Sequence, residues 1–172
     1  ITTAAASAVA RAIDFLSGEN SKIKWVNDIF VNGKKVCGIL TEASTAVEEG
    51  RLDYAVLGIG VNVYAPSGGF PKEIENIAGC VFDKQKSDMK NRLTAKILDN
   101  FYEYYKNLES REFVECYKEK QLAVGKDITV ISAGARYTAH CTGITGDCSL
   151  IAKKENGETV ILSSGEISIR IK

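Results

Sequence analysis

Apolar and polar residues alternate along this 172-residue chain with two different periods, and the change falls near residue 122. In residues 3–17 and 89–108 apolar side chains recur every three or four positions, which predicts two amphipathic helices. A shorter helix is predicted to begin near Ser110. Beyond residue 125 the alternation is that of short strands separated by glycine-containing turns. The predicted strands are residues 128–131, 137–142, 150–153, 159–162 and 167–171.

A β-hairpin is predicted in the first third of the chain. Residues 29–31 and 36–40 are apolar and β-prone, and Asn32-Gly33 between them favours a tight type I′ turn. Residues 52–63 form the most continuous apolar run, so we expect a central strand that is buried on both faces.

Three segments between these elements have weaker patterns. Residues 43–50 are polar and are predicted to form a loop. Residues 64–72 contain both prolines and a glycine pair, and we expect this loop to cover a site because it follows the long apolar run. Residues 74–82 have a weak helical pattern.

Together these elements predict an α+β fold with two domains. Residues 1–122 are expected to form a mixed β-sheet with flanking helices, and residues 123–172 a small SH3-like β-barrel built from the five short strands. Apolar residues make up 45% of the chain, which is enough to form a hydrophobic core.

Charge and cysteine content exclude several classes of function. The formal net charge is zero, which argues against a general attraction to nucleic acid. The five cysteines form no C-x-x-C pair, so we expect free thiols in a reducing cytoplasm rather than a zinc site or disulfides. No apolar run approaches 18 residues, so no membrane span is expected.

Polar side chains gather at the mouth of the predicted hairpin. Lys24, Asn27 and Asp28 precede its first strand, and Lys34 and Lys35 follow its turn. A hairpin that only had to fold would not need this cluster. Its composition suits an anionic ligand that carries both phosphate and carboxylate groups.

Three blocks of sequence resemble the biotin protein ligase family, also called biotin–[acetyl-CoA-carboxylase] ligases. The first block is Lys24-Trp25-Val26-Asn27-Asp28, followed by Lys35, then Gly38-Ile39-Leu40, then Glu42. The second is residues 56–63, which resemble the family's second strand motif, and the third is residues 164–170, which resemble its terminal motif. Val26 stands where the family most often has proline. The order of the blocks over nearly the whole chain makes chance an unsatisfactory explanation.

The resemblance implies an activity and a fold. It implies an ATP-dependent ligase that forms biotinyl-5′-AMP from biotin and ATP, with Mg²⁺ held mainly by the ATP phosphates, and then transfers biotin to a lysine of a biotin carboxyl carrier domain. It also implies that the sheet is of the class II synthetase type and that an SH3-like module ends the chain.

The resemblance also assigns catalytic residues. Lys35 matches the family lysine that lies between the biotin carboxylate and the α-phosphate, where a cation offsets their repulsion. Asp28 lies where the acceptor lysine arrives, and its carboxylate could orient that amine or accept its proton.

Further residues are candidates for ligand binding. Asn62 resembles the residue that reads adenine, and Gly38 and Gly58 mark close approaches of backbone to ligand. Leu40 and Val61 are expected to line an apolar wall. The remaining candidates are Lys24, Trp25, Asn27 (a nucleotide contact) and Arg170 (facing the nucleotide). Cys37 is expected to be a buried thiol and His140, the only histidine, a structural residue.

The family's Gly-Arg-Gly-Arg biotin loop has no counterpart in these residues. We therefore expect this chain to be the C-terminal part of a ligase, with little or no activity alone, and with exposed sheet edges that allow a homodimer. Binding of nucleic acid by this part is not expected. Two alternatives stay open from the sequence: a lipoate ligase-like acyl transferase, and a non-catalytic module that binds a carrier domain.

Overall fold

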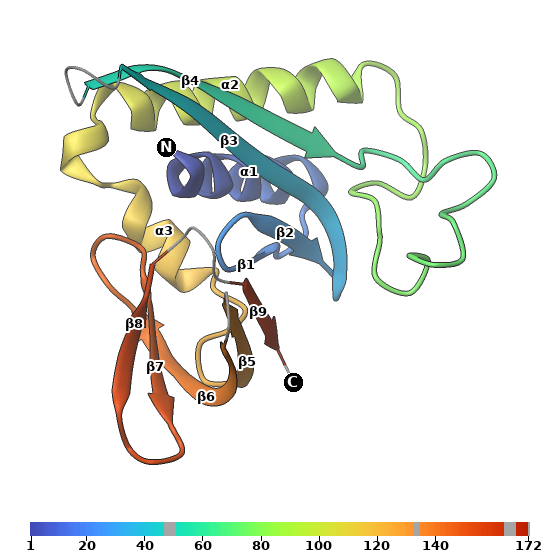
Figure 1. Cartoon of the computed structure of the whole chain (residues 1–172). Helices are drawn as coiled ribbons and strands as arrows, with labels where there is room; N and C mark the ends of the chain where they lie inside the picture. The colour runs from blue at the N-terminus through green and yellow to red at the C-terminus, as the bar shows by residue number, and fades with distance from the viewer. Residues whose placement is uncertain (47–50, 133–134, 164–167, 172) are drawn as a thin grey trace.

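The computed structural model describes residues 1–46, 51–132, 135–163 and 168–171. Their helices and strands form two antiparallel sheets with helices against them (Figure 1). The predicted α+β fold is confirmed. Parallel pairing occurs in isolated bridges, Ile23 with Gln121 and Lys35 with Ala78, rather than between the described strands.

The first sheet has the strand order β1-β2-β3-β4. Its strands are β1 (Lys22–Lys24), β2 (Asp28–Val31), β3 (Lys34–Ala46) and β4 (Arg51–Val61). Asn32 (φ 49°) and Gly33 (φ 76°) both have positive φ angles in the turn between β2 and β3. Because a type I′ turn requires positive φ at both central residues, the predicted hairpin is confirmed.

Helix α1 (Thr2–Ser17) buries an alanine-rich face against the first sheet, against α2 (Met89–Lys106) and against α3 (Phe113–Glu119). Small side chains on this face allow the helices and the sheet to approach closely. Gly18 ends α1 in the left-handed conformation, and its N–H donates to the carbonyl oxygen of Asp14 at 2.9 Å. A short 3₁₀-helix, η1 (Leu108–Ser110), joins α2 to α3.

The second sheet has the order β8-β7-β6-β5-β9. Its strands are β5 (Asp127–Ser132), β6 (Ala135–Ile144), β7 (Leu150–Lys154), β8 (Thr159–Leu162) and β9 (Ser168–Ile171). The five predicted strands are therefore present. Within the described residues no pairing joins β8 to β9, so the strands form an open series rather than a hydrogen-bonded closed barrel.

The two sheets are joined through the segment that follows α3. Ile23 of β1 donates its N–H to the carbonyl of Lys120 at 2.7 Å, and accepts from the N–H of Leu122 at 2.8 Å. The buried apolar side chains of both sheets belong to one hydrophobic cluster. The division of the chain at residues 122 and 123 stays a prediction.

Three predictions about local structure were wrong. Strand β3 continues to Ala46 where a loop was predicted, and residues 47–50 lie outside the described part. Strand β4 is an edge strand among the described residues, and Tyr54 and Val56 are 61% and 55% exposed. Residues 74–82 form no helix: residues 74–77 are turns, Ala78 makes an isolated bridge, and the rest is irregular. A continuous apolar run shows that both faces of a strand are apolar, but the elements packed against those faces determine whether they are buried.

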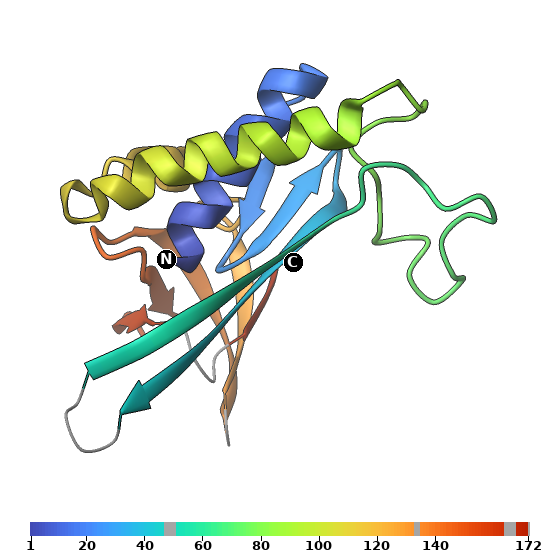
Figure 2. The same ribbon diagram turned by 90° about the horizontal axis from the view of Figure 1, so that it is seen from above.

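Figure 2 shows the far part of the β3–β4 ribbon extending away from the helices. At the other end of the ribbon, Leu57, Ile59 and Val61 face α2, and Gly38 and Gly60 therefore lie on the opposite face, where they line a cavity. This face carries the candidate site.

Candidate active site

A β-bulge brings the predicted catalytic lysine beside Asp28. The β2–β3 register passes from Ile29 opposite Cys37 to Phe30 opposite Lys35, so β3 has one extra residue, Val36. Because side chains alternate along a strand, the extra residue puts Lys35 on the same face as Asp28. The Lys35 ammonium lies 2.5 Å from an Asp28 carboxylate oxygen.

The Lys35–Asp28 ion pair contributes little to stability. The two side chains are 43% and 22% exposed, and ion pairs in such settings contribute about 0–1 kcal/mol. Both groups thus remain accessible to a ligand.

The structure brings four predicted residues from four strands to one cavity of about 500 Å³. Lys24 of β1, Asp28 of β2, Lys35 of β3 and Arg170 of β9 line it, together with apolar side chains. Three cations and one carboxylate give the cavity a net positive charge, which favours an anionic ligand.

A second cavity of about 320 Å³ also has Lys35 in its lining. It is lined by Gly38 and Gly60 of the ribbon, by Asn62, and by Ile77 from the loop that follows β4. Lys35 and Ile77 line both cavities. A ligand with an anionic centre near Lys35 could therefore extend into either cavity.

The floor beside Lys35 consists of three glycines and one leucine. Gly38 pairs with Gly60 across β3 and β4, and Leu40 pairs with Gly58, so all four lie on one face of the ribbon. A Cβ atom on Gly58 would lie 3.7 Å from the Leu40 carbonyl oxygen, and one on Gly60 would lie 3.8 Å from that of Gly38. These are ordinary contacts, so the fold itself does not require glycine at either position.

The segment after residue 70 is anchored on Lys35 by backbone hydrogen bonds. The backbone N–H of Lys35 donates to the carbonyl oxygen of Ile77 at 2.7 Å, and the N–H of Gly79 donates to the carbonyl oxygen of Lys35 at 2.8 Å. Ile74 and Ile77 are 39% and 60% exposed and line the second cavity. Neither isoleucine stood out in the sequence, because single exposed apolar residues are common on protein surfaces.

Gly79 permits the close approach of this loop to β3. A Cβ atom there would lie 2.5 Å from Cβ of Lys34. We expect Gly79→Ala to lower the free energy of unfolding by about 1–3 kcal/mol, because the backbone must move apart. Gly68→Ala is the matched control, since nothing lies within 4 Å of its Cβ position. Equal denaturation midpoints for the two variants would contradict this assignment.

The side-chain amides of Asn27 and Asn62 each hold a backbone carbonyl, one in β3 and one in the loop after β4. The Asn27 amide donates to the Ile39 carbonyl at 2.5 Å, and the Ile39 N–H donates back to the Asn27 carbonyl at 3.1 Å. The Asn62 amide donates to the Gly79 carbonyl at 3.0 Å at the rim of the second cavity. Asn27 therefore fixes the position of its neighbour Asp28.

Two predicted residues do not join the others. Val61 lies on the ribbon face opposite Leu40, where it lines a groove beneath α2, because adjacent side chains on a strand point in opposite directions. Trp25 is 5% exposed and lies in the core, where its indole N–H donates to the Cys148 carbonyl at 3.1 Å. The peptide bond between Trp25 and Val26 is cis.

Comparison with known proteins gives the family. The sequence model of the Biotin/lipoate A/B protein ligase family matches residues 2–62, and that of the Biotin protein ligase C terminal domain matches residues 124–170. The chain belongs to the biotin protein ligase family. The first match contains the hairpin, the glycine floor and Asn62, and the second ends at Arg170.

Curated relatives agree with this family. The bifunctional ligase/repressor BirA of Bacillus spizizenii is 30% identical over 169 residues, which cover 95% of this chain and 51% of the relative. The biotin–[acetyl-CoA-carboxylase] ligase of Mycobacterium tuberculosis is 24% identical over 155 residues, covering 84% and 52%. The chain thus spans about half the length of the curated relatives it matches.

Solved structures of biotin protein ligases share the fold. The biotin protein ligase from Aquifex aeolicus in complex with biotin and ATP superposes with a TM-score of 0.76 at 22% identity, over 99% of this chain and 72% of that one. At this identity the comparison establishes the arrangement of the elements. Lys35, Asp28 and the other site residues stay predictions.

Two further observations describe the rest of the molecule. Among the described residues, no three histidine, cysteine or acidic side chains gather as metal ligands, and no helix is long and apolar enough to cross a membrane. His140 is an exposed residue of β6, and its ring nitrogen lies 2.8 Å from the Asp127 carboxylate of β5.

Because of the Cys37 thiol, we expect the free energy of unfolding to fall at alkaline pH. Burial, with a smaller contribution from Asp28, raises the pKa of its thiol from 9.0 to about 12. The thiol therefore contributes stability that is complete below pH 9 and is lost as the pH rises toward 12. Between those limits we expect the free energy of unfolding of the wild type to fall up to about 4 kcal/mol further than that of Cys37→Ala. Urea denaturation across this range measures both curves, and parallel curves would contradict the assignment.

Proposed function

We propose that the full-length protein carrying this chain is an ATP-dependent biotin protein ligase. It forms biotinyl-5′-AMP and transfers the biotinyl group to a lysine of a carboxylase carrier domain. The position of Lys35, which lines two cavities beside the glycine-rich floor, is the observation that carries this proposal.

The first step joins two anions. A carboxylate oxygen of biotin attacks the α-phosphorus of ATP, and the bond to pyrophosphate breaks. The ammonium of Lys35 lowers the repulsion between the reactants and stabilises the charge on the phosphoryl oxygens. Mg²⁺ would be held chiefly by the ATP phosphates, because Asp28, the carboxylate in this cavity, is already paired with Lys35.

The floor and its rim suit the two ligands. Gly38, Gly58 and Gly60 allow the flat surface of a ligand to approach the backbone, and Leu40, which is 61% exposed, offers apolar contact to biotin. Asn62 at the second cavity has an amide oxygen and nitrogen that can pair with adenine.

The second step uses the positively charged cavity. The ε-amine of the acceptor lysine attacks the biotinyl carbonyl carbon, the bond to AMP breaks, and the amine loses a proton. Asp28 orients the amine and accepts that proton. Lys24 and Arg170 line the same cavity and stabilise the phosphate of the departing AMP.

Specific observations favour biotin over lipoate. The family model that matches residues 2–62 covers both classes of ligase. The second match, over residues 124–170, is to a domain named for biotin protein ligases. A lipoate ligase-like transferase is therefore the second candidate.

Pyrophosphate release distinguishes these functions. We expect the full-length protein to release pyrophosphate from ATP with biotin and not with lipoate, and to biotinylate a purified carrier domain but not its acceptor Lys→Arg variant. Release with lipoate alone would establish the second candidate. Tight binding of the carrier domain without any release would indicate a non-catalytic binding module and contradict the proposal.

A further inference from the structure

A buried tyrosine outside the candidate site holds the backbone that leads into Asp28. Tyr117 of α3 has no exposed surface, and its hydroxyl donates to the Val26 carbonyl at 2.9 Å. Burial raises the pKa of Tyr117, so its hydroxyl remains a donor throughout the pH range of the reaction. Val26 lies two residues before Asp28.

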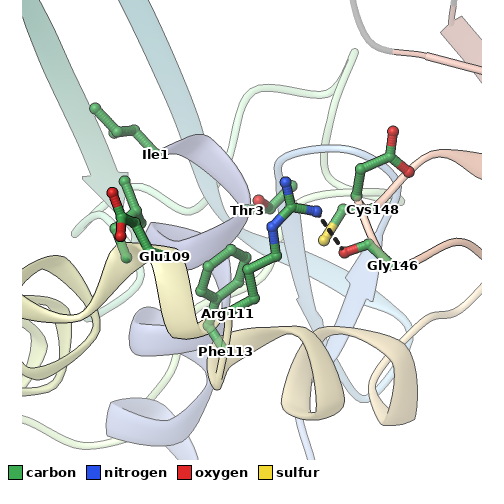
Figure 3. A pocket seen from close by; sticks show the side chains of 9 residues that line it. Ile1, Thr3, Glu109, Arg111, Phe113, Gly146 and Cys148 are labelled. Atoms are coloured by element: carbon green, nitrogen blue, oxygen red, sulfur yellow. Dashed lines mark hydrogen bonds between the residues drawn. The ribbon is translucent and has the colours of Figure 1, made fainter.

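The same backbone is held from a second direction by the turn between β6 and β7. The Trp25 indole donates to the Cys148 carbonyl of this turn. Arg111, just before α3, donates in turn to the Gly146 carbonyl at 3.1 Å, as Figure 3 shows beside a cavity of about 360 Å³. Three hydrogen bonds therefore connect residues 25–26, the β6–β7 turn and the α3 segment in a triangle.

Little freedom remains between this triangle and Asp28. Asn27 is fixed to β3 by the two hydrogen bonds with Ile39. A shift of the Val26 carbonyl therefore has to move Asn27 and Asp28 or break those bonds. The carboxylate of Asp28 is 2.5 Å from Lys35, so a small displacement changes its direction toward the cavity.

We propose that Tyr117 is a positioning residue, whose hydroxyl sets the orientation of Asp28 for the transfer of biotin to the carrier lysine. This inference rests on the proposed function and goes beyond it, because it places part of the control of the transfer step in α3 and the second sheet. Tyr117 itself touches no reacting group.

The experiment is a double-mutant cycle on the transfer step in the full-length protein. Biotinyl-5′-AMP is formed first, and single-turnover transfer to a carrier domain is then measured for wild type, Tyr117→Phe, Asp28→Asn and the double variant. We expect Tyr117→Phe to slow transfer roughly tenfold, as misplacement of a catalytic group does, with the affinity for biotinyl-5′-AMP changed less than twofold. In the Asp28→Asn background the same substitution should change the rate less than twofold.

Tyr104→Phe is the matched control. Tyr104 is also buried, at 7% exposure, and its hydroxyl accepts from Arg11 at 2.9 Å, between α2 and α1 and away from Asp28. We expect this variant to transfer biotin at the wild-type rate. Trp25→Phe, which removes the second hydrogen bond of the triangle, is a further test that does not depend on the folding of Tyr117→Phe.

The outcomes separate this inference from the proposed function. If the wild type forms no biotinyl-5′-AMP, the proposed function fails. If it does, and Tyr117→Phe slows transfer by the same factor in the wild-type and Asp28→Asn backgrounds, Tyr117 has only a structural role and the inference is overturned. Wild-type transfer rates in both Tyr117→Phe and Trp25→Phe would overturn it as well.

Discussion

Replacing Lys35 with methionine should lower the rate of biotinyl-5′-AMP formation roughly 100- to 1000-fold in the full-length protein. The methionine side chain keeps much of the apolar stem but removes the cation between the two anionic reactants. Because the ion pair with Asp28 contributes at most about 1 kcal/mol, the denaturation midpoint should change little. Single-turnover formation of biotinyl-5′-AMP measures the effect separately from product release.

Lys106→Met is the matched control for this prediction. Lys106 is also 43% exposed and lies 3.0 Å from the carboxylate of Glu103, but it belongs to α2 and lines neither cavity of the site. Its substitution should leave the rate of biotinyl-5′-AMP formation unchanged. If Lys35→Met formed biotinyl-5′-AMP as fast as the wild type, Lys35 would have no role in the reaction and the hairpin would not be the active site.

Enlarging Gly58 in the full-length protein should weaken the binding of biotin without unfolding the protein. The series Gly58→Ala and Gly58→Val places first one and then three carbon atoms on the floor beside Leu40. We expect the biotin dissociation constant to rise by about tenfold for alanine and by roughly 100-fold or more for valine, since overpacking costs about 1–3 kcal/mol. The free energy of unfolding should stay within about 1 kcal/mol of wild type, because a Cβ meets only an ordinary contact there.

Gly143→Ala provides the comparison on the second sheet. Its Cβ position lies 3.8 Å from the Ile151 side chain, close to the 3.7 Å contact found at Gly58. Calorimetric titration with biotin and thermal denaturation should show that this variant resembles the wild type in both respects. Unchanged biotin affinity in Gly58→Val would mean that the floor is not a ligand surface.

Local signals in the sequence accounted for much of the fold. The Asn32-Gly33 turn was predictable because few residues tolerate positive φ at two successive positions. The helices and the strands of the second sheet followed from the periods of their apolar residues. The cluster of Lys24, Asp28 and Lys35 was visible because all three lie within one hairpin and the strand before it.

Other features could not be predicted from neighbouring residues. The position of β4 at the edge depends on which strands pair with it, and the burial of Trp25 depends on a turn 123 residues further along the chain. The separation of Val61 and Leu40 onto opposite faces of the ribbon was not predictable either, because a motif gives the order of residues but not the face on which each side chain lies.

By itself the sequence determined the family, the elements and the local group of charges at the hairpin, since these depend on residues close together in the chain. Only the tertiary structure decided which distant groups meet that hairpin. The pairing of β9 with β5 brings Arg170 to the cavity of Lys35, and the packing of α3 places the Tyr117 hydroxyl on Val26. Such contacts arise from the burial of apolar surface between segments, which no short stretch of sequence specifies.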